Sequence, residues 1–214
     1  MGIPVIQEYE VPTGVVLARE PLPWSVQPRA AALLVHDMQN YFLARYESER
    51  FVRKLVANVD AIRRKCHTLG IPTFYTAQPG NQSPQERGLL MDMWGRGLSD
   101  DPHACAIVQG LEPIEGLDRL IQKRRYSAFA RTRLLETLKE QGRTQLIVTG
   151  VYAHIGCLVT ATEAFMQDIQ PFVVADALAD FSLAHHDMAL RHMAHCSSRV
   201  MSTAELLSQL GRAE

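Results

Sequence analysis

Asp37, Lys123 and Cys157 each follow a run of residues that predicts a β-strand. An acid, an ammonium and a thiol at one place could transfer a proton, bind an anion or attack an electrophilic carbon. In open parallel sheets, ligands bind beyond the carboxyl ends of the strands, where the strand order reverses. If the order is 3-2-1-4-5-6, Asp37 and Cys157 lie on either side of that reversal. The three residues are therefore candidates for a catalytic site.

Cys157 stands where a turn, Gly150 to Gly156, meets a predicted helix. Free backbone N–H groups and the helix dipole at such a place lower the pKa of a thiol and favour anions. A cysteine here is a nucleophile or simply a small packed residue, and packing is the commoner role. Asp37 has a similar alternative, because an acid after a strand often caps a helix.

Stretches with strand and helix patterns alternate along the chain and predict the elements that would position these residues. The predicted strands cover 30–35, 73–77, 117–122, 146–148, 172–175 and 199–201, and the main helices 52–69, 134–142, 157–165, 182–196 and the residues after 202. This alternation is typical of a doubly wound parallel sheet in one α/β domain. We expect that domain over residues 30–214, after an extended proline-rich arm over residues 1–29. The polar region 81–115 predicts a functional loop or short helices.

The composition excludes several classes of protein. A chain of 214 residues with 47% hydrophobic and 21% charged residues can bury a core without disulfides or metal. The net charge of −1 gives no reason to expect nucleic acid or an anionic membrane as partner. No segment resembles a signal peptide or is long enough to span a bilayer. The four cysteines are scattered, which suits a reducing cytoplasm.

No motif points to a metal or a cofactor. Neither GxGxxG nor GxxxxGK[ST] occurs, so dinucleotide or nucleoside triphosphate binding has no support. Four of the eight histidines share one predicted helix, but HExxH is missing, and solvent or structural roles are favoured for them. They are His185, His186, His192 and His195. We expect neither a metal nor a cofactor.

Long runs of the sequence resemble the isochorismatase family, from near the first residue to the last helix. These runs are LLVHDMQNYF, YTAQPGNQSPQERGLL, MWGRGL, KRRYSAF and GVYAHIGCLVTATEAFMQDIQPFVVADALADFS. The resemblance implies a six-stranded parallel sheet with helices on both faces. It also implies a hydrolase that cleaves the enol-ether bond of isochorismate, giving pyruvate and 2,3-dihydroxy-2,3-dihydrobenzoate for siderophore biosynthesis.

The resemblance gives Asp37 the role of general acid, with Lys123 as the second catalytic residue. An enol ether hydrolyses when its terminal CH₂ carbon is protonated and water captures the resulting oxocarbenium ion. The ordinary pKa of an aspartic acid is about 3.9, so Asp37 needs a dry pocket that raises it. A nearby Lys123 opposes this, unless it pairs with a carboxylate or hydroxyl of the substrate in the complex.

The substrate is a dianion, so its site should contain hydrogen-bond donors and apolar walls. The resemblance implies substrate contacts from Gln78, Arg87, Lys123, Tyr152 and the backbone N–H of Gly156, and apolar walls from Phe42 and Trp94 that keep water from Asp37. Arg87 suits a carboxylate because its guanidinium is planar and two-pronged. The resemblance also implies a cis peptide bond between Val151 and Tyr152, and a homodimer or higher homo-oligomer.

Two features depart from the family's pattern. Arg124 stands where relatives usually have Trp in the KxRYSAF run, and we expect it to face outward. Many siderophore-pathway relatives continue into an aryl carrier domain, and here nothing follows Glu214. Either the chain stands alone or it is truncated, and synthetase partners are expected only in the second case.

Three other functions stay open. A close branch of the family, from phenazine pathways, cleaves the 2-amino analogue of isochorismate; the retained Cys157 favours isochorismate. Amidases of the wider superfamily use Asp, Lys and Cys as a covalent triad, but nicotinamidases carry an Asp-x-His metal motif where this chain has Gln78-Pro79-Gly80. A scaffold protein without activity is disfavoured by the intact set of site residues.

Overall fold

The fold is built on a six-stranded parallel sheet with the order β3-β2-β1-β4-β5-β6, seen in a computed structural model that describes residues 2–15 and 22–211. The strands are β1 (Ala31–His36), β2 (Thr73–Ala77), β3 (Asp118–Gln122), β4 (Gln145–Val151), β5 (Gln170–Ala179) and β6 (Arg199–Met201). The predicted fold class and the order 3-2-1-4-5-6 are confirmed.

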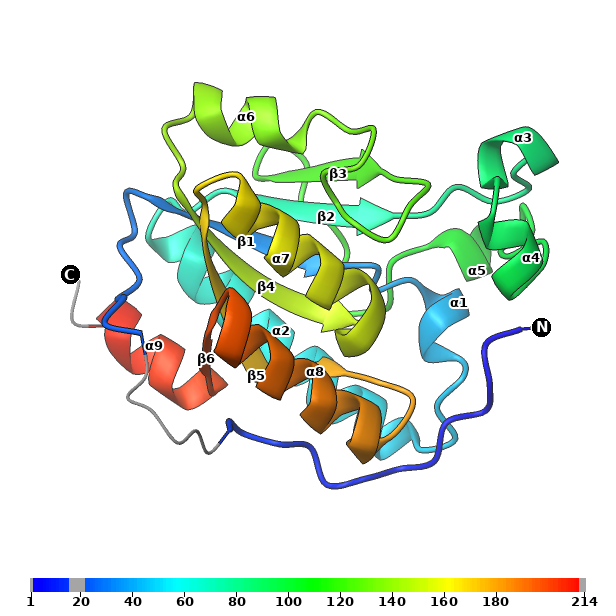
Figure 1. Ribbon diagram of the computed structural model, residues 1–214, viewed down its shortest axis with the longest axis horizontal. Helices are drawn as coiled ribbons and strands as arrows, with labels where there is room; N and C mark the ends of the chain where they lie inside the picture. Colours follow the sequence, from blue (N-terminus) through cyan, green and yellow to red (C-terminus); the bar gives the residue numbers. More distant parts are fainter. Residues whose placement is uncertain (1, 16–21, 212–214) are drawn as a thin grey trace.

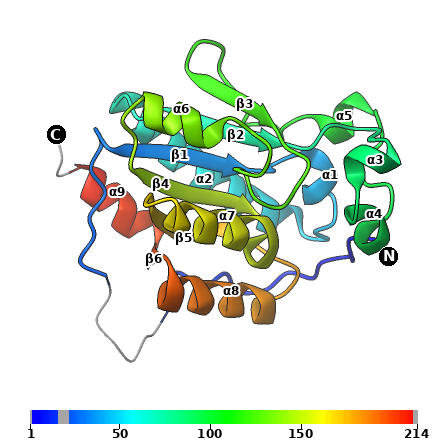
Figure 2. The same ribbon diagram turned by 45° about the horizontal axis from the view of Figure 1, so that its top comes forward.

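Helices cover both faces of the sheet, and three short ones lie beyond its edge (Figures 1 and 2). The helices of the described residues are α1 (Asn40–Leu43), α2 (Glu49–Thr68), α3 (Pro84–Arg87), α4 (Leu90–Trp94), α5 (Pro102–Cys105), α6 (Leu134–Glu140), the π-helical turn η1 (Ala153–Cys157), α7 (Leu158–Met166), α8 (Leu183–Cys196) and α9 (Thr203–Gly211). Helices α2 and α9 pack on one face and α6, α7 and α8 on the other. The region 81–115 holds the short helices α3, α4 and α5, as expected.

The continuous apolar run of β1 is explained by burial on both sides. All of its residues are buried, and successive side chains enter opposite apolar layers. Leu33 and Val35 belong to the layer under α2, whereas Ala32 and Leu34 belong to the layer under α7. In contrast, β3 lies at the sheet edge and is largely exposed, which explains its weak sequence signal.

Several predicted boundaries differ from the structure because capping and pairing extend the elements. Helix α2 begins at Glu49, since the Ser48 side chain accepts a hydrogen bond from the Phe51 N–H. Strand β5 begins at Gln170, before the predicted 172–175, because Gln170 and Pro171 also pair with β4. The predicted strands at 73–77 and 199–201 have the observed boundaries.

The described residues before position 30 form neither a helix nor a strand, apart from one isolated bridge between Ile6 and Tyr46. Ile6 is fully buried, and Trp24 packs against Phe172 with ring centroids 6.3 Å apart. Residue 1 and residues 16–21 of the predicted arm lie outside the described residues. The division into an arm over 1–29 and a domain over 30–214 stays a prediction.

Neither a membrane span nor a disulfide is found in the described part of the chain. No helix there is long and apolar enough to cross a bilayer. All four cysteines are free, and only Cys196 is exposed. Within the same residues, no group of three or more His, Cys, Asp and Glu side chains is arranged to hold a metal ion.

Candidate active site

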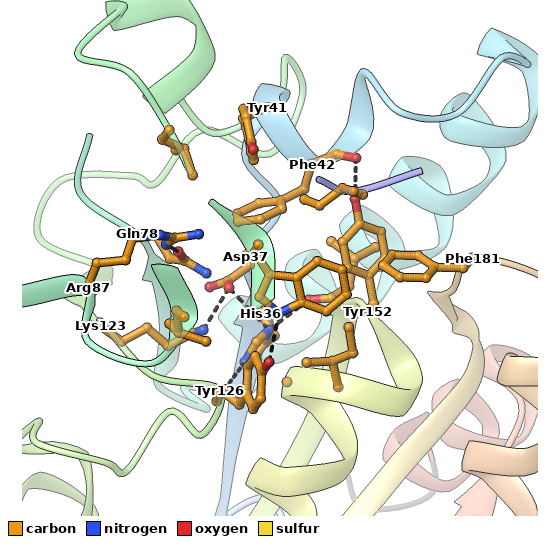
Figure 3. Close-up of a pocket in the computed structure, with 17 residues that line it drawn as sticks. His36, Asp37, Tyr41, Phe42, Gln78, Arg87, Lys123, Tyr126, Tyr152 and Phe181 are labelled. Carbon is orange, nitrogen blue, oxygen red and sulfur yellow. Dashed lines mark hydrogen bonds and ion pairs between the residues drawn. The ribbon is translucent and has the colours of Figure 1, made fainter. Parts of the chain in front are cut away.

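A pocket with about 550 Å³ of empty volume opens at the carboxyl ends of the central strands (Figure 3). Eight of the nine residues predicted for the site line it: Asp37, Phe42, Gln78, Arg87, Trp94, Lys123, Tyr152 and Gly156. The ninth, Cys157, is not among the lining residues. Figure 3 shows polar side chains gathered on one side of Asp37 and aromatic rings on the other.

Asp37 and Lys123 form a buried ion pair in this pocket. Lys123 Nζ lies 2.7 Å from Asp37 Oδ2, and the Thr76 hydroxyl donates to Asp37 Oδ1 at 2.7 Å. Lys123 Nζ also donates to the Arg125 carbonyl at 3.0 Å. Asp37 is 4% exposed and Lys123 is 2% exposed, so solvent screens their attraction little.

The pKa of Asp37 is lowered, not raised. Burial works to raise it, but the charges of Lys123 and His36 and the hydrogen bonds from Lys123 and Thr76 together outweigh burial. Lys123 thus opposes the effect of the dry pocket, as expected of a nearby cation, and the raised pKa stays a prediction for the complex with substrate. Asp37 is a carboxylate at neutral pH in this state.

Asp37 does not cap a helix. Gln39 occupies the N-cap position of α1, and the Asp37 carboxylate binds Thr76 and Lys123 instead. The Asp37 backbone has φ 49°, a left-handed conformation that Asp adopts more readily than most residues. The capping alternative is thus excluded, and the carboxylate faces the pocket.

Arg87 places a second buried cation in the pocket. Its Nε donates to the Gly95 carbonyl at 2.8 Å and its Nη1 donates to Gln78 Oε1 at 3.2 Å. Among the described residues, no carboxylate lies within ion-pair distance of this guanidinium. Burial lowers the pKa of Arg87, yet a guanidinium stays charged near neutrality. A buried guanidinium without an anionic partner can bind a carboxylate of a ligand.

Gln39 holds the Gln78 backbone in place and was missed by the sequence analysis. Its Nε2 donates to the carbonyls of Gln78 and Cys105 at 2.9 and 2.8 Å, and its Oε1 accepts from the Gln78 N–H at 2.7 Å. Gln39 is fully buried, so both ends of its amide are used within the protein. The residue is within the motif that carries Asp37, which is the signal that could have found it.

Aromatic side chains form the other side of the pocket. Tyr152 packs against Phe42 and Phe181, with ring centroids 6.0 and 4.6 Å apart, and Trp94 Nε1 donates to the Tyr126 hydroxyl at 2.7 Å. The Tyr152 hydroxyl donates to the Phe42 carbonyl at 2.7 Å, so its proton is already bound and its ring faces the pocket. Burial raises the pKa of Tyr152 well above its ordinary value.

The turn after β4 is shaped by a cis peptide and by His36. The bond between Val151 and Tyr152 is cis, as expected. His36 Nδ1 is 2.8 Å from the Val151 carbonyl oxygen and Nε2 is 3.2 Å from that of Tyr126. A Cβ on Gly156 would overlap the His36 ring, so only glycine allows this close approach. Burial lowers the pKa of His36.

Cys157 is buried behind the pocket, in the packing role that the sequence analysis favoured, and the pKa-lowering effect that a helix start can have on a thiol does not prevail here. The residue is fully buried among apolar side chains of the layer under α7. Burial raises the pKa of the thiol well above its ordinary value, with a further increase from Asp37 and Asp180. The Cys157 N–H donates to the Tyr152 carbonyl within the turn, so it is not free to bind an anion.

Arg124 lies outside the pocket, half-exposed, with its guanidinium 3.3 Å from the Glu86 carboxylate. The sequence analysis did not identify several other lining residues: Ile3, His36, Tyr41, Leu90, Leu98, Tyr126, Val151, Ile155 and Phe181. Most lie within the motifs that carry the predicted residues, which could have indicated them. Ile3 comes from the distant N-terminal segment, and no sequence signal pointed to it.

Comparisons with known proteins give a consistent result. The family model of the isochorismatase domain matches residues 31–205. The chain is 50% identical over 215 residues to "Isochorismatase" of Bacillus subtilis, across 100% of this chain and 68% of that protein. It is 49% identical over 208 residues to "Enterobactin synthase component B" of Escherichia coli K12, across 97% and 73%.

Two further comparisons concern the phenazine branch and the fold. The chain is 47% identical over 206 residues to "Phenazine biosynthesis protein PhzD1" of Pseudomonas aeruginosa, across 96% of this chain and 99% of that protein. The solved structure of a cysteine hydrolase from Pseudomonas syringae superposes with a TM-score of 0.84 at 19% identity, across 92% and 100%. That likeness concerns the fold alone.

Proposed function

This chain belongs to the isochorismatase family, and we propose that it hydrolyses the enol-ether bond of isochorismate to pyruvate and 2,3-dihydroxy-2,3-dihydrobenzoate. The observation that carries this function is the buried carboxylate of Asp37 in a pocket that also holds Lys123 and the unpaired Arg87. This arrangement suits an anionic substrate that must receive a proton.

Binding of the dianion prepares the acid. A substrate carboxylate or hydroxyl takes the Lys123 ammonium as its partner, while Arg87 binds a carboxylate through its guanidinium. When the substrate anion also binds the Lys123 ammonium, the effect of Lys123 on the pKa of Asp37 weakens. The effect of burial then prevails, and the pKa of Asp37 rises. Asp37 then binds a proton and holds it near the enol-ether carbons.

The reaction proceeds through proton transfer to carbon. Asp37 donates its proton to the terminal CH₂ carbon, the double bond supplies the electron pair, and an oxocarbenium ion forms. Water adds to the cationic carbon and loses a proton to the Asp37 carboxylate, which restores the acid. The hemiketal then collapses: the bond from its carbon to the ether oxygen on the six-membered carbocycle breaks, the hemiketal hydroxyl proton goes to that oxygen, and pyruvate is released. Phe42 and Trp94 exclude bulk water from the carboxylate.

Hydrolysis of the 2-amino analogue is the second candidate, and the likeness to PhzD1 favours it. An amidase mechanism is disfavoured, because the Cys157 thiol is buried and does not line the pocket. Lactate dehydrogenase can follow pyruvate release from either enol ether, and ammonia release from nicotinamide tests the amidase. A kcat/KM for the amino analogue far above that for isochorismate would move the assignment to the phenazine type.

We also propose a cytoplasmic homodimer or higher homo-oligomer that acts in a siderophore pathway. The similarity to an enterobactin synthase component supports the pathway, and four free cysteines suit a reducing compartment. The assembly is proposed from the family resemblance.

A further inference from the structure

The N-terminal segment reaches the pocket from far away in the sequence. Figures 1 and 2 both show the first described residues of this segment near α4, at the end of the sheet where the strands finish. Ile3 lines the pocket, is half-buried and packs against the apolar layer that includes Phe42 and Tyr152. We propose that the anchored N-terminal segment places Ile3 in the wall of the substrate pocket and that Ile3 is a specificity-determining residue; this inference rests on the function proposed above.

Ile6 fixes the segment to the loop after α1. The Ile6 N–H donates to the Arg45 carbonyl at 2.8 Å, and the Glu47 N–H donates to the Ile6 carbonyl at 3.0 Å. The Ile6 side chain is fully buried in the core. Backbone pairing on both sides and a buried side chain make this point a firm anchor, three residues from Ile3.

Tyr9 provides a second anchor, which connects to the pocket. Its hydroxyl accepts from the Asp180 N–H at 2.8 Å and lies 2.9 Å from His186 Nδ1, to which it donates. His186 then carries its proton on Nε2, 3.1 Å from the Ala175 carbonyl. Asp180 immediately precedes Phe181, a lining residue. The segment is therefore held at both Ile6 and Tyr9.

Asp180 extends this anchor to the turn that carries Gly156. Its carboxylate accepts from the His154 N–H at 2.6 Å and from the Phe181 N–H at 2.7 Å, and its side chain is fully buried. The position of the segment and the shape of the pocket are thereby set by one connected network. Ile3 supplies apolar surface to a pocket that also holds the cations Lys123 and Arg87, and such surface suits the uncharged part of a small cyclic diacid.

Val5 provides a matched control because it lies on the same segment and is 63% exposed. We compare Ile3→Trp and Ile3→Ala with Val5→Trp and Val5→Ala, measuring kcat and KM by pyruvate release from isochorismate. Both Ile3 variants should raise KM about tenfold, the usual effect of misfitting one side chain of a hydrophobic pocket. The Val5 variants should stay near wild type. A general loss of folded protein lowers kcat instead, and melting temperatures report it separately.

A second measurement does not depend on turnover. Ile3→Cys and Val5→Cys, each made in a Cys105→Ser/Cys196→Ser background, are labelled with a small maleimide. The thiol at position 5 should react quickly and the thiol at position 3 slowly. Equal labelling rates, or equal KM values for the Ile3→Trp and Val5→Trp variants, would overturn the inference. A wild-type enzyme that releases no pyruvate would instead overturn the proposed function. The labelling rates would still show whether the side chain at position 3 is enclosed in the pocket.

Discussion

The ammonium of Lys123 lies 2.7 Å from a carboxylate oxygen of Asp37, and both side chains are almost completely buried. Each ion offsets part of the cost of burying the other, so loss of either charge leaves the remaining ion buried without compensation. A substrate anion that binds Lys123 weakens its hold on Asp37 and lets the carboxyl bind a proton. Asp37 is therefore a carboxylate in the ligand-free protein, and in the mechanism that we propose substrate binding converts it to the acid.

Replacing Asp37 should abolish proton transfer to carbon. We expect Asp37→Asn and Asp37→Ala to reduce kcat about 10²–10⁴-fold, because an amide can donate a hydrogen bond but not a proton. Pyruvate release measures the loss. Either change leaves Lys123 buried without its partner, at a cost of about 3–5 kcal/mol in the free energy of unfolding. Asp37→Asn with Lys123→Met should recover stability but not activity; near-normal rates in folded Asp37→Asn would contradict the mechanism.

Cys157→Ala should fold and retain substantial activity. The thiol is buried, does not line the pocket, and burial raises its pKa, so it supplies no thiolate. Cleavage of isochorismate also offers no acyl group for a thiolate to attack. Pyruvate release and the melting temperature decide the matter. A folded but inactive Cys157→Ala enzyme, beside an active Asp37→Asn enzyme, would establish a nucleophilic mechanism instead.

Arg87→Lys should raise KM by about tenfold, with a smaller effect on kcat. Lysine keeps the charge but cannot bind a carboxylate through two parallel hydrogen bonds, and it loses the contacts with Gly95 and Gln78. Arg96→Lys, an exposed substitution in the same loop, is the control and should leave KM unchanged. Equal KM values for the two variants would show that Arg87 does not bind the substrate.

His186 should make the protein sensitive to mild acid. Burial lowers the pKa of His186 to about 4, whereas the unfolded chain has the ordinary value near 6.5. Between these values the unfolded state binds a proton that the folded state does not, so stability falls as pH drops from about 6.5 to about 4. The expected loss from this residue is about 2 kcal/mol between pH 7 and pH 5.

Urea unfolding at pH 7 and pH 5 tests this sensitivity. In His186→Gln the fall in the free energy of unfolding should be smaller than in wild type by about 2 kcal/mol. His192→Gln, an exposed change on the same helix, should keep the wild-type difference. Tyr9 and Asp180 are groups that also face the His186 ring. If the pH dependence of stability is unchanged in His186→Gln, the acid sensitivity belongs to other titratable groups.

Light scattering at micromolar concentration should report a dimer or a larger assembly. The chain has a mass of 24.0 kDa, so a homodimer is expected near twice that value. A species of 24.0 kDa alone, across the whole concentration range, would refute the proposed assembly. Addition of isochorismate should not alter the result if the assembly is constitutive.

The sequence alone determined the sheet and the place of its chemistry. Strand β1 is apolar at successive positions because both of its faces are covered, and that pattern can be read without a structure. Parallel strands end at a common edge, so Asp37 and Lys123, which directly follow two of them, had to lie near one another. The family motifs then identified Arg87 and Gln78.

Only the tertiary structure decided how these groups behave. The pKa of Asp37 depends on whether burial or the distance to Lys123 dominates, and no local pattern fixes that balance. Of the two roles left open for Cys157, packing holds, because side chains from other elements exclude water from the thiol and raise its pKa. Ile3 reaches the pocket because Ile6 and Tyr9 are anchored to distant parts of the chain. Such long-range contacts leave no periodic signal in the sequence, since each depends on where two separated segments meet in space.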